Sequence, residues 1–420
     1  MPRAARWSLP WLAMVLCSCG CSIGPRAIHR DRILYNEAIK TSTEEQLLLN
    51  IVRLRYTDTP SSLGVSSLAD QYEVTKNISL MPFFTSAAAG QAFGGYRGAV
   101  LPQAGIATAQ RPTLTYQPQD DQDFTRRLFT PLSLEATASL SKTTWPISTV
   151  FRLWLENLNW VSNAETASGP TPRDPPDYAE FLSGVEALQR LNDRKLATVF
   201  TEEQDDPASD DIPSEKITAL AAVSAAKAGF EYRKVEKTGN WRVVRKKQQP
   251  ILRVADSAKS DPDFLEFCRA FKLDPSLTAF EMSTGKLDPF LKDAPKAGLA
   301  GLDLETRSLL QVLYFVANGV DVPASHLASG EAPLTREADG GAFDWNQVLG
   351  GLFKVGSACG KKPPANAHVA ILYKGYWFYI DERDRDSKAT FSLLVELSRL
   401  QLSGDKGGTG PVLTLPIGGR

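Results

Sequence analysis

Aromatic and charged residues are concentrated near the C-terminal end of the chain, where their spacing could form a binding surface. Two short apolar runs, residues 367–373 and 376–381, are separated by Lys374-Gly375. Runs of this length around a two-residue turn with glycine predict a β-hairpin. Side chains alternate between the two faces of a strand. One face of the second run therefore carries Tyr376, Phe378 and Ile380, and the other carries Trp377, Tyr379 and Asp381.

An aromatic face of this kind is chemically suited to binding. Rings at rigid positions stack on sugar faces or on extended chains with a small loss of conformational entropy. If one face is exposed, it would hold a glycan strand or a peptide. The alternative is that both faces are covered, one of them by the amphipathic helix predicted over residues 387–402. The candidate binding residues are Tyr376, Trp377, Tyr379, Asp381, Arg383 and Lys388.

The same region offers little for catalysis. Asp381 and Asp384 would suit general acid–base chemistry only if they were buried together. The sequence has no HExxH, GxSxG, P-loop or SxxK pattern that would supply a metal site, a nucleophile or a phosphate-binding loop. Its cysteines and histidines form no zinc-type cluster, and His29, His326 and His368 occur singly. We therefore predict no catalytic residue, no metal and no cofactor.

The N-terminus has the pattern of a bacterial lipoprotein signal. Arg3 and Arg6 precede an apolar run over residues 7–16, which is shorter than the roughly 20 residues that span a bilayer. Small residues precede Cys19 and Cys21. Cys19 fits the lipid-attachment pattern best because a leucine lies three places upstream, and Cys21 is the alternative. The predicted signal peptide covers residues 1–18, or 1–20 if Cys21 is acylated; an ordinary cleaved signal is the competing interpretation.

Acylation would determine where the mature chain works. A cysteine that carries several acyl chains, palmitate among them, holds a soluble domain firmly on a membrane. The next residue is Gly20 or Ser22 rather than aspartate, which indicates the periplasmic face of the outer membrane. The expected partners are the lipid bilayer and, beyond it, envelope proteins or peptidoglycan. An oxidising compartment would permit a disulfide between Cys268 and Cys359, but two unpaired thiols are favoured.

Composition excludes other classes of protein. The chain has 420 residues, 47 Lys and Arg against 48 Asp and Glu, and 43% hydrophobic residues. Near-neutral charge argues against a nucleic-acid partner, and the ordinary hydrophobic content argues against a polytopic membrane protein.

Periodicity along the chain predicts an α+β fold with one or two domains behind a lipidated tether. The expected domains are a tether over 19–35, an N-terminal α+β domain over 36–200, an acidic linker or loop over 201–213, and a C-terminal α+β domain over 214–416. The Gly-rich residues 84–110 suggest a long hairpin or an excursion that reaches a neighbouring chain. Helices are expected over 37–56, 120–140, 145–155, 178–191, 214–228, 263–271, 304–318 and 387–402. Strands are expected near 63–80, 113–116, 196–200, 231–235, 241–245, 251–254, 367–373, 376–381 and 412–415.

Two charged clusters accompany these elements. Residues 202–211 contain six acidic side chains, which is the basis for the expected linker. A basic cluster lies on the strands that follow, and a solvated strand face that balances the acidic segment is favoured over a contact with lipid phosphates. The basic cluster consists of Arg242, Arg245, Lys246, Lys247 and Arg253.

Three blocks of sequence resemble a family of proteobacterial lipoproteins of uncharacterised function. They are residues 30–36 (RDRILYN), 46–56 (QLLLNIVRLRY) and 375–381 (GYWFYID) with Ser387-Lys388. The resemblance extends over residues 25–416 and implies an outer-membrane lipoprotein, but it implies no activity and no catalytic residue. The combined hypothesis is a membrane-anchored periplasmic binding or assembly component of the cell envelope. An enzyme that acts on cell-wall glycan or peptide, with its site near 367–388, is the alternative.

Overall fold

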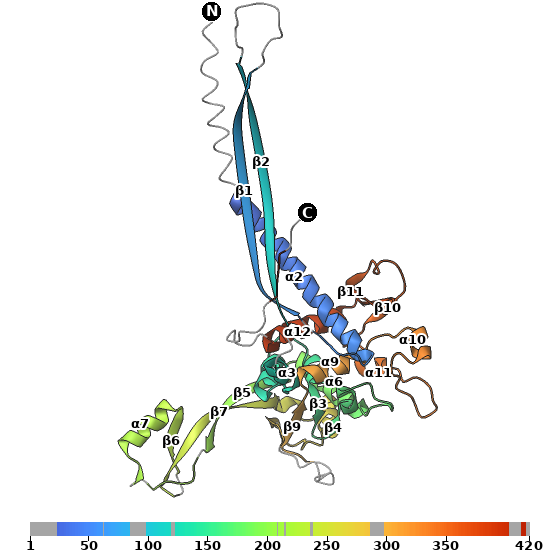
Figure 1. The fold of residues 1–420 in the computed structure, drawn as a ribbon. Helices are drawn as coiled ribbons and strands as arrows, with labels where there is room; N and C mark the ends of the chain where they lie inside the picture. Colours follow the sequence, from blue (N-terminus) through green and yellow to red (C-terminus); the bar gives the residue numbers. More distant parts are fainter. Residues whose placement is uncertain are drawn as a thin grey trace, which may run out of the picture. The chain divides into compact units, whose positions relative to one another are not determined.

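The computed structural model confirms an α+β fold (Figure 1). It describes residues 23–61, 63–84, 98–118, 122–207, 209–213, 216–235, 238–285, 298–402 and 413–416. The predicted signal peptide with Cys19 and Cys21 lies outside these residues. The chain divides into two compact units: residues 1–60 with 123–404, and residues 61–122 with 405–420. The expected division near 201–213 is therefore not the one that the structure makes.

The larger unit is built on a seven-stranded sheet with the order β4-β3-β9-β8-β7-β5, in which β6 pairs with β7. Neighbouring strands are antiparallel except β8 and β9, which run parallel. The strands are β3 (Leu155–Leu158), β4 (Val161–Ser162), β5 (Ala197–Pro207), β6 (Phe230–Lys234), β7 (Trp241–Val254), β8 (Ala279–Ser283) and β9 (Gly301–Thr306). This sheet takes strands from both sides of residues 201–213, so the two predicted α+β domains share one sheet.

Helices cover this sheet and form a single core with it. Buried apolar side chains extend from Leu48 to Leu397 within one cluster. The helices are α2 (Ile23–Arg55), α3 (Gln122–Phe129), α4 (Leu134–Ser141), α5 (Ile147–Trp154), α6 (Ala179–Asp193), α7 (Ala219–Lys227), α8 (Pro262–Ala270), α9 (Leu309–Ala317), α10 (Ala324–Ser329), α11 (Asn346–Leu349) and α12 (Arg385–Leu402). The described residues also include two short 3₁₀ turns, η1 (Glu165–Ser168) and η3 (Asp256–Ala258).

Helices α6 and α8 approach each other closely because a glycine lies at their contact. A Cβ atom on Gly184 would lie 2.5 Å from the Phe271 ring and 2.7 Å from Ala270 Cβ. Phe181 and Phe271 pack edge to face beside this point, with ring centroids 5.7 Å apart. The small residue thus sets the spacing of the two helices.

Arg307 is a fully buried cation between β9 and α9. Its guanidinium donates to the backbone oxygens of Arg152, Leu155 and Asn163 and to Ser168 Oγ. It also lies 4.0 Å from the centroid of the Phe315 ring. Burial lowers the pKa of Arg307 to about 9, so the guanidinium is still protonated at neutral pH. The side chain ties together the backbone around β3 and positions the start of α9.

A second sheet of three strands carries the aromatic hairpin. Its order is β10-β12-β11, with β10 (Gly356–Ala358), β11 (Ala367–Tyr373) and β12 (Tyr376–Asp381). The predicted turn is confirmed: Lys374 has φ 45° and Gly375 has φ 84°. Two positive φ values in succession are the geometry of a type I′ turn, whose twist matches that of the strands. α12 follows β12, as the sequence predicts.

The acidic segment and the basic cluster pair with each other as strands. β5 continues through the acidic residues to Pro207, opposite β7, and the register places Asp205 against Lys246 and Asp206 against Arg245. Glu203 forms an ion pair with Lys246 at 3.0 Å. The segment expected as a linker is thus a strand as far as Pro207. β6 pairs with β7 over residues 241–245, and α7 lies beside β6 (Figure 1).

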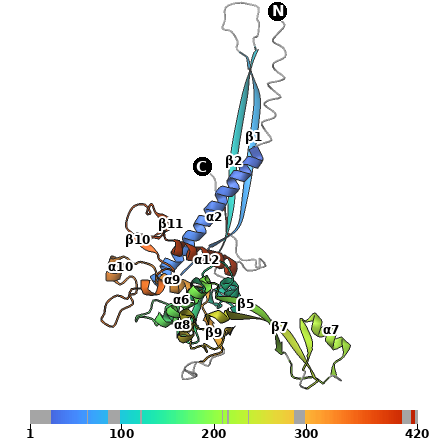
Figure 2. The same cartoon turned by 180° about the vertical axis from the view of Figure 1, so that it is seen from behind.

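The smaller unit is a long antiparallel ribbon. β1 (Leu63–Phe84) pairs with β2 (Gly98–Pro118) along its whole length, and β13 (Leu413–Pro416) adds to β2 at residues 113–116. Of the Gly-rich residues 84–110, residues 98–110 are regular strand paired with β1, and residues 85–97 lie outside the described residues. Both strands are visible in the front and back views (Figure 2).

Several helices differ from their expected bounds. The helix expected over 37–56 begins at Ile23, so residues 23–35 of the expected tether are helical, and the helix expected over 214–228 begins at Ala219. The helix expected over 304–318 begins at Leu309, because residues up to Thr306 form β9 and Ser308 caps α9 in a capping box with Gln311. The helix expected over 120–140 is divided into α3 and α4, since Pro131 lies between them and a proline interrupts a helix.

Candidate functional site

The outer face of the three-stranded sheet forms an apolar and aromatic surface, which we call the shelf. The register places Leu372 opposite Trp377 and Ala370 opposite Tyr379, so these four residues share one face. Leu372 is 57% exposed, and Trp377 and Tyr379 are partly buried. The opposite face is buried: Phe378 and Ile380 are fully enclosed, and the core closes over Val369 and Ile371. One face of the hairpin is therefore covered and the other is partly open to solvent.

The two rings of the shelf are held by the neighbouring strand β10 and the loop after it. The Trp377 indole N–H donates to the Gly360 carbonyl at 3.1 Å. The Tyr379 ring lies across Gly356, where a Cβ atom would be 3.1 Å from the ring. Gly356 thus allows the ring to lie flat against the strand. Rings fixed in this way lose little entropy when a ligand stacks on them.

Tyr376 lies on the other face and does not belong to the shelf. Its hydroxyl is 3.1 Å from Ser325 Oγ, and its ring packs edge to face on His326 with centroids 4.9 Å apart. His326 in turn contacts Tyr56, whose hydroxyl is 2.7 Å from His326 Nδ1. Of the candidate binding residues, Tyr376 is therefore part of an internal aromatic cluster with Tyr56 and His326.

Asp381 and Asp384 are committed to local structure. Asp381 accepts the Arg383 backbone N–H at 2.8 Å and the side-chain amide of Asn366. Asp384 accepts both the Ser387 N–H, at 3.0 Å, and the Ser387 hydroxyl, at 2.7 Å. Three of the four carboxylate oxygens hold the turn between β12 and α12, and the fourth, Asp381 Oδ2, accepts from Asn366 just before β11. This arrangement fixes the edge of the shelf but does not form a pair of carboxylates that converge on a substrate.

The remaining charged candidates lie beside this turn. Lys388 pairs with Glu382, which is also 3.0 Å from His368 Nδ1. Lys388, and after it His368, lowers the pKa of the Glu382 carboxyl. Arg383 is exposed. Lys388 is thus already neutralised by Glu382, whereas Arg383 extends into solvent at the end of the shelf.

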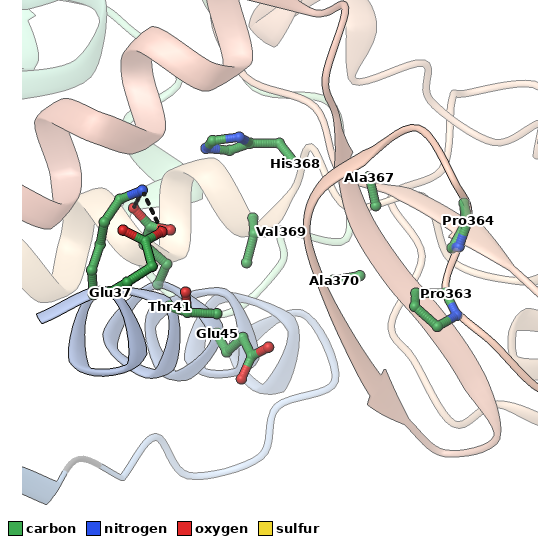
Figure 3. A pocket seen from close by; sticks show the side chains of 11 residues that line it. Glu37, Thr41, Glu45, Pro363, Pro364, Ala367, His368, Val369 and Ala370 are labelled. Atoms are coloured by element: carbon green, nitrogen blue, oxygen red, sulfur yellow. Dashed lines mark ion pairs between the residues drawn. The ribbon is translucent and has the colours of Figure 1, made fainter. Parts of the chain in front are cut away.

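A groove of about 410 Å³ lies between α2 and β11, which sequence reasoning did not find (Figure 3). Its helical wall carries Glu37, Thr41, Glu44 and Glu45, and Lys40 pairs with Glu37 at 3.5 Å and with Glu44 at 3.9 Å. Figure 3 shows His368 and Val369 on the side of β11 that faces the helix. The spacing of these charges on one helix face was the available signal, but their position opposite β11 depends on the fold.

A cation lies next to the internal aromatic cluster. Lys374 Nζ, at the hairpin turn, is 4.9 Å from the centroid of the Tyr56 ring and 3.9 Å from both Asp58 and Glu331. Desolvation, with the nearby Glu331 carboxylate, raises the pKa of Tyr56 to about 12. The lysine thus connects the hairpin to the end of α2. Because the shelf is part of this hairpin, the same contacts help to position it.

The cysteines and the other titratable groups give no further chemistry. Cys268 is buried and Cys359 exposed, and both are free thiols. Within the described part of the chain, no three His, Cys, Asp or Glu side chains are grouped as a metal ion would require. In the same residues, no helix is long and apolar enough to cross a membrane.

Comparison with known proteins adds no relative: no family model, no curated protein and no solved structure matches this chain. The resemblance to lipoproteins therefore remains an expectation from the sequence.

Proposed function

We propose that this chain is a lipid-anchored protein of the cell envelope that works by binding, and that the shelf is its binding surface. The observation that carries the proposal is the partly open face that bears Leu372, Trp377 and Tyr379, whose opposite face is buried in the core. A ligand of matching chemistry is a glycan strand or an extended peptide, because both present flat or linear surfaces on which rings stack. Cell-wall peptidoglycan offers both.

The local chemistry supports binding over catalysis. An enzyme acting near residues 367–388 would need two carboxylates that face a substrate within a concave site. Asp381 and Asp384 instead accept hydrogen bonds from their own turn. Arg383, the exposed cation at the end of the shelf, is then suited to orient a ligand.

Binding through the shelf predicts a loss when its rings are removed. Trp377→Ala and Tyr379→Ala together should weaken sedimentation of the protein with purified peptidoglycan sacculi by about tenfold, since each aromatic contact contributes roughly 0.5–1.5 kcal/mol beyond its buried area. Leu265→Ala on α8, where the leucine is 41% exposed, is the matched control and should leave binding unchanged. Equal sedimentation of all three proteins would contradict the proposal for this ligand.

The anchor requires a separate test. Replacing both Cys19 and Cys21 by alanine should move the protein from the membrane to the soluble fraction, because the acyl chains would be absent. The single variants then identify the acylated residue, since only one of them should release the protein. Retention of the double variant on the membrane would contradict lipid anchoring.

A further inference from the structure

We propose that the ribbon of the smaller unit associates with a second copy of this chain, by antiparallel pairing of β1 with the β1 of the other copy. The inference does not rest on the shelf, because the two surfaces lie in different units of the chain. It depends on the backbone of the ribbon and on the register in which residues would meet.

The ribbon has little to stabilise it by itself. A two-stranded hairpin is marginally stable in water, and β13 extends the sheet at only four residues. Within the smaller unit, the described residues form this sheet alone, without a second layer. Strands of 22 and 21 residues, about 70 Å long at roughly 3.3 Å per residue, therefore need a partner of comparable length.

The outer edge of β1 offers the longer run without proline for pairing. In the sheet order β1-β2-β13, β1 has β2 as its single hydrogen-bonded neighbour among the described residues. The register is irregular between Val65 and Ser67 and then continuous, and residues 67–81 contain no proline. The edge of β2 is different, because Pro102 and Pro112 lack an N–H and β13 covers residues 113–116. Long edges without proline or bulges are sites of strand addition.

The residues of β1 are self-complementary in one register. Period two places Leu68, Tyr72, Val74 and Ile78 on one face of β1 together with the charged residues Asp70 and Lys76, and mainly polar residues on the other face. In an antiparallel pair, the residue numbers of any two opposed residues add up to the same sum. Like faces of the two β1 strands therefore meet only when this sum is even. In the register whose sum is 146, Lys76 of one copy opposes Asp70 of the other. It also pairs Leu68 with Ile78, Tyr72 with Val74, Gln71 with Thr75, Ala69 with Asn77, and Ser67 with Ser79.

This register is symmetric about Glu73, which opposes the Glu73 of the second copy. A two-fold axis at that point makes each pair occur twice, as a symmetric dimer requires. The two opposed carboxylates repel each other, so Glu73→Gln should strengthen the association. Opposite charges across a strand pair attract, and two Lys76–Asp70 pairs fix the register against its neighbours.

Cross-linking of single cysteines tests the register directly. In the full chain with Cys359→Ala, Glu73→Cys should give a covalent dimer with a short bis-maleimide, above the background of the parent. Gln71→Cys and Thr75→Cys should each give none alone but should cross-link when the two proteins are mixed, because residue 71 opposes residue 75. No dimer from Glu73→Cys, or equal yields at all three positions separately, would overturn the proposal.

A charge exchange provides a second measurement, independent of whether one cysteine variant folds well. Lys76→Asp in the Glu73→Cys chain should lower the dimer yield about tenfold. The substitution places an aspartate opposite Asp70 in each of the two symmetry-related pairs, and like charges repel. Adding Asp70→Lys should restore the yield. Within the ribbon, Lys76 lies opposite Ile106 and Asp70 opposite Pro112, so the exchange breaks no directly opposed charge pair inside one chain. Failure of the double exchange to restore the dimer would overturn the register.

Discussion

The hydroxyl of Tyr56 and the imidazole of His326 meet 2.7 Å apart in the core, although 270 residues separate them in the chain. Tyr56 follows the last residue of α2, and His326 lies in α10 with 7% of its surface exposed. Tyr376 packs on the same imidazole, and Lys374 on the Tyr56 ring. The pair therefore joins the N-terminal helix to the hairpin that carries the shelf.

Removing the Tyr56 hydroxyl should destabilise the larger unit. Tyr56→Phe keeps the ring but leaves Nδ1 of a buried imidazole without its partner, which costs about 1–3 kcal/mol. Urea unfolding followed by tryptophan fluorescence measures the change. Tyr379→Phe, which removes the hydroxyl of a partly buried tyrosine on the shelf, is the control and should change the free energy of unfolding by much less. Equal effects of the two substitutions would contradict a structural role for the Tyr56–His326 contact.

Alkaline pH should weaken the same contact. The pKa of Tyr56 is about 12 in the fold against 10 for an ordinary tyrosine, so the folded chain holds this proton more tightly than the unfolded chain. The stabilisation is complete below pH 10 and is lost as the pH rises towards 12. The difference in unfolding free energy between the parent and Tyr56→Phe should shrink across this window. A constant difference from pH 9 to 12 would exclude a raised pKa.

The contact of α6 with α8 should not tolerate a methyl group. Gly184→Ala places a Cβ 2.5 Å from the Phe271 ring, and relief of such a clash typically costs about 1–3 kcal/mol. Thermal unfolding should show a lower Tm. Gly169→Ala, where no atom lies within 4 Å of the added Cβ, should leave the Tm nearly unchanged and serves as the matched control.

The two free thiols of the larger unit should differ sharply in reactivity. Cys268 is 3% exposed, and desolvation raises its pKa to about 12, so little thiolate is present and it is shielded. Cys359 is exposed. Brief treatment with iodoacetamide, followed by peptide mass mapping, should modify Cys359 in the folded chain and Cys268 only in urea. Rapid modification of Cys268 without denaturant would show that the core around α8 opens.

Local sequence signals predicted those elements whose conformation depends on near neighbours. Lys374-Gly375 predicted the hairpin turn because a type I′ turn is fixed by two residues. The periodic spacing of apolar residues predicted the helices over 37–56 and 178–191. The first coincides with the C-terminal part of α2, and the second with most of α6. The α+β class follows from the same patterns. The predicted signal peptide also depends on adjacent residues, although it lies outside the described structure.

Only tertiary structure decided the features that depend on distant partners. The acidic residues 202–207 have the composition of a loop, yet they form a strand because β7 supplies opposite charges and hydrogen bonds across the sheet. Alternation along β12 separated Tyr376 from Trp377 and Tyr379, but which face is open depends on the core that covers Phe378 and Ile380. The sequence determined by itself what each segment could become, since turns and periodic faces are local. Burial and strand pairing depend on the whole chain, and they decided which residues remain exposed and available for binding.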